Sequence, residues 1–390
     1  MHALVFRLTL LWLVGNALRM SILAVPPVIP LLRDEFHLSG TEIGVLTGLP
    51  IVLFAAAALI GSRLVALIGV VPAVVAGLLL TAIGSALRGG ASGIVALFAA
   101  TALMSAGVAI TQPAMPALVG RWLPDRIALG TAVYTNGLLI GEILPVSLFS
   151  VLFALTGQSW RATFVLWALP IAAIAVLVLA FAPHDTGTPV TVSGSWWPRW
   201  RLRDIVRLGL VFGATNALYF ASNAFLPGQL TEAGRPDLIG PALTALNLGQ
   251  LPASLLLIVF ARRLERKGWP FLLAGILALT SIAVIVAASG VSTVASAAVL
   301  GFAAGGAFAL GLTLPPLLSA QAEVARVSAA MFTVSYSTAL VVSILSGAAW
   351  DIAGSAQFAF LPIAISALPL LVLVPTIDFQ RRPQSATSAG

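Results

Sequence analysis

An arginine inside a long apolar run is the first residue of this sequence that could do chemistry. Arg19 lies within the run from Leu8 to Pro30. A guanidinium near the middle of a membrane helix costs about 2.5 to 3.5 kcal/mol on insertion scales, and such residues usually face a bundle interior or a water-filled pathway. We therefore predict that Arg19 contacts a substrate. The alternative is a structural arginine that pairs with a carbonyl or carboxylate and holds two helices together.

Uncharged polar residues at helical spacing in other apolar runs could hydrogen-bond the same substrate. Asn16 precedes Arg19 by three residues, and in a later run Asn216, Tyr219 and Asn223 follow at intervals of three and four. Such intervals place side chains on one face of a helix. The candidate substrate-binding residues are Arg19, Asn16, Gln112, Asn216, Tyr219, Asn223, Asn247, Gln250 and Tyr336. The alternative is hydrogen bonding between helices, which is common for polar side chains in membranes.

Glu142 is the only acid that we place within an apolar span. A buried carboxylate is a candidate proton carrier, because desolvation favours its neutral form. Asn136 precedes it by six residues, which is about 120° around a helix, so the two side chains cannot both point squarely into one cavity. Spacing gives no reason to pair Glu142 with Arg19, since the two lie in different runs.

The composition defines the class of protein. The chain has 390 residues, of which 59% are hydrophobic and only 8% charged, and its mean hydropathy is +1.06. These values predict a multi-pass membrane protein. The chain has no cysteine, and its three histidines lie in predicted loops or tails, so we expect neither a metal site nor a catalytic centre. There is no phosphate-binding loop motif, which argues against ATP as the energy source.

Twelve apolar runs are long enough to cross a bilayer, where a helix needs roughly 20 residues. They lie at 8–30, 43–67, 70–87, 93–119, 127–155, 161–182, 205–230, 239–261, 270–289, 292–319, 327–349 and 357–377. With a cytoplasmic N-terminus, fifteen of the 20 lysines and arginines fall inside and four outside, Arg88 and Arg161 among the four. The positive-inside rule therefore predicts two cytoplasmic termini, and topology explains the net charge of +7 without a nucleic-acid partner.

Three pairs of glycines stand four residues apart within these runs. They are Gly44 and Gly48, Gly137 and Gly141, and Gly301 and Gly305. Small residues at this spacing let two membrane helices approach closely. We predict that these glycines serve helix packing.

The two halves of the sequence resemble each other. Asn16 to Arg19 is matched by Asn216 to Tyr219, Pro27 by Pro227, and Leu49-Pro50 by Leu251-Pro252. Matches near one offset over successive spans indicate a duplication. We predict an all-α membrane protein of 12 transmembrane helices in two pseudo-symmetric six-helix bundles, the architecture of the major facilitator superfamily, whose substrate site lies near the midplane between the halves. The expected parts are an N-terminal bundle at 1–183, a cytoplasmic loop at 184–204, a C-terminal bundle at 205–379 and a cytoplasmic tail at 380–390.

Two stretches resemble the cyanate and 2-nitroimidazole transporter family of this superfamily. The first reads Gly15-x-x-x-Arg19 followed by Pro27-x-x-Pro30-x-x-Arg33. The second contains Gly107, Gln112, Met115-Pro116, Val119, Arg121 and Arg126 in the family's order. The chain departs from the family at Ala17 and Met20, where asparagine and proline are frequent. The resemblance implies a transporter in a bacterial-type inner membrane.

Three functions are compatible with these features. The first is a secondary active or facilitative transporter that moves a small anion by alternating access, with Arg19 as the anchor; cyanate-like ions, small carboxylates and inorganic anions are the candidates. The second is an exporter of neutral nitroaromatic or drug-like compounds. The third is a membrane receptor or enzyme without transport activity. We expect a monomer without cofactors that contacts the lipid bilayer, with protons as candidate coupling ions through Glu142.

Overall fold

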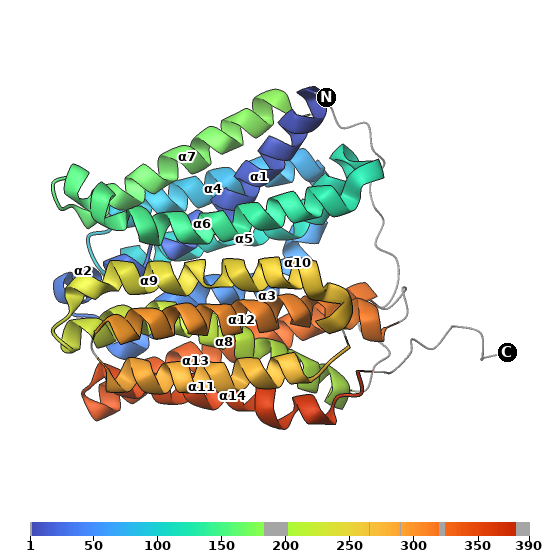
Figure 1. Cartoon of the computed structure of the whole chain (residues 1–390). Helices are drawn as coiled ribbons and strands as arrows, with labels where there is room; N and C mark the ends of the chain where they lie inside the picture. The colour runs from blue at the N-terminus through green and yellow to red at the C-terminus, as the bar shows by residue number, and fades with distance from the viewer. Residues whose placement is uncertain (1, 183–201, 265, 289, 320–323, 380–390) are drawn as a thin grey trace. The chain divides into compact units, whose positions relative to one another are not determined.

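The computed structural model describes residues 2–182, 202–264, 266–288, 290–319 and 324–379 (Figure 1). Within these ranges every regular element is a helix, and ten helices are long and apolar enough to cross a membrane. The protein is therefore a multi-pass membrane protein. It divides into two compact units, one formed by Met1–Leu38 and Leu49–Val192, the other by Ser39–Gly48 and Ser193–Gly390.

The first unit is a bundle of long helices around α1. Its helices are α1 (His2–Leu23), α2 (Ile29–Phe36), most of α3 (Gly40–Ile68), α4 (Val70–Gly89), α5 (Ile94–Trp122), α6 (Ile127–Leu155) and α7 (Trp160–Phe181), with 3-10 turns at Pro26–Val28 and Pro124–Arg126. Helix α1 packs along α6, and α4 packs against both α5 and α7 (Figure 1). The five helices α1, α4, α5, α6 and α7 thus each pack against a neighbour of the same unit.

The second unit is organised around α8, most of which is buried. Its helices are α8 (Leu202–Glu232), α9 (Ile239–Leu248), α10 (Gln250–Leu264), α11 (Trp269–Ala287), α12 (Val291–Leu318), α13 (Val324–Ala353) and α14 (Phe360–Val372), with 3-10 turns at Pro236–Leu238, Ala356–Ala359 and Val374–Thr376. Helix α8 contacts α13, α14 and α12, while α12 also contacts α9, α10 and α11. This unit includes the first turns of α3 as well.

Ten of the twelve predicted spans coincide with the ten long apolar helices. The run at 43–67 lies on α3, and the run at 239–261 lies on α9 and α10, which are separated at Gly249. Pro252 explains this break, because it has no N–H to donate to the carbonyl of Leu248. The count of 12 transmembrane helices, the cytoplasmic termini and the division into bundles at 1–183 and 205–379 stay predictions. The tail at 380–390 and most of the loop at 184–204 lie outside the described residues; α8 begins at Leu202.

Glycines bring α1 and α6 into close contact. A Cβ atom built on Gly137 would collide with the backbone oxygen of Trp12, and one on Gly141 with that of Asn16. In the other two pairs, a Cβ atom on Gly44 or Gly301 would collide with the backbone oxygen of Ser343 or Leu246, and one on Gly48 or Gly305 with the side chain of Leu340 or Gln250. The predicted role of the three glycine pairs in helix packing is thus confirmed.

The first turn of α3 is fixed to the end of α13. The carboxylate of Asp351 accepts hydrogen bonds from the backbone N–H of Gly40 at 2.6 Å and of Thr41 at 2.8 Å, and from the Thr41 hydroxyl at 2.6 Å. A carboxylate at a helix N-terminus satisfies free N–H groups and is favoured by the helix dipole. These bonds explain why Ser39–Gly48 belongs to the second unit.

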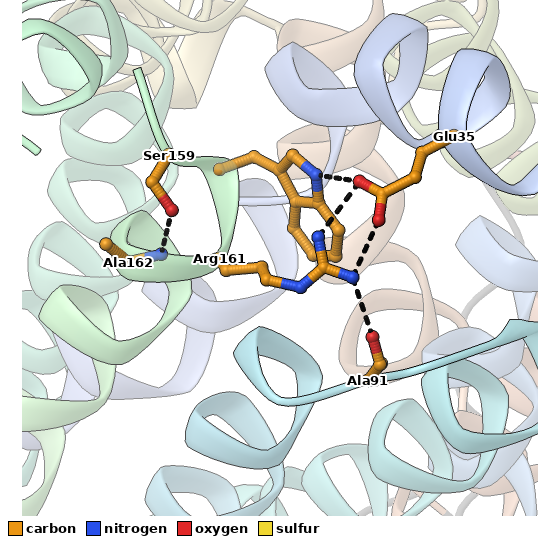
Figure 2. A network of polar contacts seen from close by, with 6 residues as sticks. Glu35, Ala91, Ser159, Arg161 and Ala162 are labelled. Carbon is orange, nitrogen blue, oxygen red and sulfur yellow. Dashed lines mark hydrogen bonds and ion pairs between the residues drawn. The ribbon is translucent and has the colours of Figure 1, made fainter. Parts of the chain in front are cut away.

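A carboxylate also holds the end of α2 against the start of α7 (Figure 2). Glu35 accepts hydrogen bonds from the indole of Trp160 at 2.7 Å and from Arg161 at 2.9 Å, and Arg161 donates to the backbone oxygen of Ala91 at 3.0 Å. In the second unit Glu232 accepts a hydrogen bond from the indole of another tryptophan, Trp350, at 2.9 Å. Each unit thus has a contact between a carboxylate and an indole, from Glu35 on α2 in the first and from Glu232 at the end of α8 in the second.

Arg88, which the topology prediction counted among the outside charges, is completely buried in the last turn of α4. Its Nη2 atom donates to the backbone oxygen of Ser21 at 2.7 Å and to the Ser21 hydroxyl at 2.5 Å, and its Cζ atom lies 4.6 Å from the centre of the Phe164 ring. The N–H of Val25 bonds to Ile22 instead of Ser21, so the Ser21 carbonyl needs another donor. A cation at a helix C-terminus supplies that donor and complements the helix dipole.

We expect Gly141→Ala to destabilise the protein. The new methyl group would collide with the Asn16 carbonyl, and overpacking of this kind costs about 1 to 3 kcal/mol. Gly120→Ala in α5 is the matched control, because no atom lies within 4 Å of a Cβ there and alanine favours a helix. Thermal unfolding in detergent should show a lower melting temperature for Gly141→Ala only. Equal melting temperatures would contradict the close approach of α1 and α6.

We expect Arg88→Ala to lower the melting temperature as well, because it leaves the buried Ser21 carbonyl without a donor, at a cost of about 1 to 3 kcal/mol. Arg203→Ala removes an exposed arginine of α8 and serves as the control. The same unfolding measurement compares them. If both variants melt at the wild-type temperature, Arg88 does not secure the end of α1.

Candidate functional site

The structure joins the two charges that the sequence places within apolar spans of the first unit. The Nε atom of Arg19 on α1 lies 3.4 Å from Oε1 of Glu142 on α6, and the two side chains are only 7% and 8% exposed. Sequence spacing gave no reason to expect this pair. Its cause is the close packing at Gly137 and Gly141, which brings the two helix backbones together at this level. A buried ion pair needs such proximity, because each charge alone would be very costly.

Further polar groups lie on the same face of α1 as Arg19. Asn16 is buried, and its Nδ2 atom donates to the backbone oxygen of Trp12 at 3.1 Å. Its Oδ1 atom is buried and has no hydrogen-bond partner among the described residues. The indole N–H of Trp12 donates to Oδ1 of Asn136 at 2.9 Å. Trp12, Asn16 and Arg19, at intervals of four and three, therefore form one continuous stripe on α1.

Gln112 remains apart from this stripe. It lies on α5, where its Oε1 atom is buried and has no hydrogen-bond partner in the described part of the chain. A buried amide oxygen without a partner is costly and is an acceptor available to a ligand or water. Gln112 thus stays a candidate substrate-binding residue, separate from the stripe on α1.

Three predicted residues of the second unit form a connected chain of hydrogen bonds. The hydroxyl of Tyr219 on α8 donates to Oδ1 of Asn247 on α9 at 2.5 Å, and Nδ2 of Asn247 donates to Oδ1 of Asn223 at 2.9 Å. Asn223 in turn donates to the backbone oxygen of Tyr219 at 3.0 Å. All three side chains are buried. The predicted stripe on α8 therefore continues onto α9.

The remaining candidates of the second unit are buried at other points. Nδ2 of Asn216 donates to the hydroxyl of Ser335 on α13 at 2.8 Å. Tyr336 stacks on Phe332 with ring centres 5.6 Å apart. Gln250 begins α10, where its side-chain stem packs against Gly305. The structure thus joins Tyr219, Asn223 and Asn247, and it connects Asn216 to α13.

Trp12, Asn136 and Ser335 are contacts of the candidate site that the sequence prediction did not include. Trp12 precedes Asn16 by four residues, so the spacing used for Asn16 and Arg19 could have identified it. Ser335 gave no comparable signal, because serine is frequent in membrane helices and its partner lies on another helix.

Solved structures share this fold over nearly the whole chain. A POT family transporter in complex with 5-aminolevulinic acid superposes with a TM-score of 0.75 and 13% identity, covering 94% of this chain and 95% of the other. The nucleoside transporter NupG superposes with a TM-score of 0.73 and 14% identity, covering 97% and 98%. At these identities the similarity is one of fold.

Sequence relatives cover the chain almost completely. The cyanate transport protein CynX of Escherichia coli K12 is 29% identical over 379 residues, which span 94% of this chain and 96% of CynX. The 2-nitroimidazole transporter of the same organism is 24% identical over 371 residues, 92% of each chain. An uncharacterized transporter of Bacillus subtilis 168, YycB, is 26% identical over 80% of this chain and 78% of its own. The resemblance suggested by the motifs around Arg19 and Gln112 is thus confirmed.

The family model described as Major Facilitator Superfamily matches residues 11–230, more than half of the chain. That range includes the Arg19 and Glu142 pair and the stripe of α8. With this match and relatives that are transporters, the chain belongs to the major facilitator superfamily.

Proposed function

We propose that this protein is a secondary transporter that carries a small anion across a bacterial inner membrane by alternating access, as a monomer and with Arg19 as the substrate anchor. The observation that carries the proposal is the buried contact of Arg19 with Glu142. A guanidinium in a bilayer must be compensated by a negative charge or by helix carbonyls. An anionic substrate can supply the same compensation as Glu142, so the site is suited to exchange one for the other. The name of the relative CynX, a cyanate transport protein, supports an anion.

Glu142 would couple this exchange of anions at Arg19 to the uptake of a proton. When an anion binds the guanidinium, the buried carboxylate of Glu142 loses its contact with this positive charge. Protonation removes that charge at far lower cost than keeping it in a low-dielectric site. We therefore propose that anion binding and protonation of Glu142 occur together, so that one anion moves with one proton.

Uncharged polar groups would hydrogen-bond the substrate and so add to the selectivity of the site. The free Oδ1 of Asn16 and the Oε1 of Gln112 are acceptors, and amide assignments can be reversed to present donors instead. The chain of Tyr219, Asn247 and Asn223 offers hydroxyl and amide groups in the second unit. We propose that Asn216, Gln250 and Tyr336 support or extend this set.

A second candidate function is the export of neutral nitroaromatic compounds. The relative described as a 2-nitroimidazole transporter favours it. In that case Arg19 would donate hydrogen bonds to a nitro group and would keep its ion pair with Glu142. The two functions differ in whether substrate binding consumes a proton and whether a charged analogue is preferred.

We expect Arg19→Ala to weaken anion binding at least about 30-fold, since truncating one member of a buried charge pair costs about 2 to 5 kcal/mol. Arg19→Lys should also weaken it, because lysine cannot present a planar fork to the anion. The double variant Arg19→Ala with Glu142→Gln keeps the site neutral, so its loss of binding cannot be ascribed to an unpaired carboxylate. Calorimetry on purified protein with cyanate and acetate gives the affinities. Wild-type affinity in these variants would refute the anchor.

Proton uptake on binding tests the role of Glu142. In the wild type, calorimetry in two buffers of different ionisation enthalpy should report about one proton taken up per anion, and affinity should rise as pH falls, by at most about tenfold per unit. Glu142→Gln should bind the anion with no proton uptake and no such pH dependence. If the variant takes up protons as the wild type does, Glu142 is not the coupled group.

A further inference from the structure

An open groove of about 250 Å³ lies on the first unit, next to the candidate site. It is lined by Val5, Leu8, Thr9 and Trp12 of α1 and by Val133 of α6. The lining is mostly apolar. The hydroxyl of Thr9 is bonded to the backbone oxygen of Val5 at 3.0 Å. The groove therefore suits an apolar group better than a hydrated ion.

The groove reaches Trp12, which lies on the face of α1 that carries Arg19. Trp12, Asn16 and Arg19 are separated by four and three residues, so they share that face. Seven residues correspond to about 10 Å along the helix axis. Helical side chains lean toward the N-terminus, so the long side chain of Arg19 extends back toward Asn16 and the groove. One compact molecule can therefore contact the cation and the apolar groove at once.

Trp12 is held in a fixed orientation at the end of this groove. Its indole N–H donates to Asn136 at 2.9 Å, and its backbone oxygen accepts a hydrogen bond from Asn16 and abuts Gly137. The indole thus belongs to α1 and is hydrogen-bonded to α6 through Asn136. An aromatic side chain restrained in this way offers a prepared surface for another ring, because aromatic pairs favour offset or edge-to-face contacts.

We propose that this groove binds the apolar, planar part of the substrate while Arg19 binds its anionic group, which makes the substrate class an organic anion with a single ring. This inference rests on the proposed role of Arg19. The volume agrees with one ring, because pockets for larger, drug-sized ligands measure about 300 to 1,000 Å³. Asn16 lies between the two parts and is placed to contact the junction of ring and anionic group.

The test compares two carboxylates that differ in the ring, benzoate and acetate, by calorimetry on the purified full-length protein. The wild type should bind benzoate about ten- to a hundredfold more tightly than acetate, as expected for burying one ring. Trp12→Ala should bring that ratio close to one, while Trp12→Phe should keep most of it because it retains an aromatic surface. Arg203→Ala, far along the sequence and exposed, is the control and should keep the ratio.

Three outcomes overturn the inference about the groove. The first is benzoate that binds no more tightly than acetate in the wild type, and the second is acetate binding without benzoate binding. The third is a Trp12→Ala variant that keeps the wild-type ratio, which would indicate that the groove holds lipid chains. Failure of the proposed function looks different: either neither carboxylate binds the wild type, or Arg19→Ala binds both as tightly as the wild type. The two failures are therefore distinguishable.

Discussion

The contact between Arg19 and Glu142 is the interaction on which the rest of the account depends. A bilayer offers no water to solvate a guanidinium, so the protein must provide a negative charge or carbonyl groups for it. The structure does so at 3.4 Å across α1 and α6. Gly137 and Gly141 let the backbones of these two helices approach closely beside the pair. The glycines, the packing of α1 and the candidate anion site are therefore parts of one arrangement.

Other arginines show how carbonyls at helix ends compensate a cation. Arg7 donates to the backbone oxygen of Trp122 at the end of α5, Arg88 to Ser21 near the end of α1, and Arg266 to Leu317 near the end of α12. Carbonyls at a helix C-terminus have no backbone donor, so they accept from a guanidinium. Arg19 lies one turn before the end of α1, yet its side chain pairs with the carboxylate of Glu142. This ion pair sets it apart from the three arginines that donate to carbonyls at helix ends.

The sequence predicts those features that depend on one segment at a time. Hydropathy located the long apolar helices, and the spacing of Gly137 and Gly141 predicted close packing. Contacts between helices depend on how each helix is rotated about its axis, which spacing within one run does not determine. For this reason the pairing of Arg19 with Glu142 and the burial of Arg88 were not foreseen. Arg19 and Tyr219 occupy matched positions of the predicted duplication, yet only the structure connects Tyr219 to Asn247.

The most direct test of the anion exchange at Arg19 is a crystal structure with selenocyanate, whose selenium gives an anomalous signal. The account predicts a selenium peak beside the Arg19 guanidinium, with the ion in contact with it and the Glu142 carboxylate moved away from its present position. A structure with selenocyanate bound elsewhere and the contact between Arg19 and Glu142 intact would contradict it.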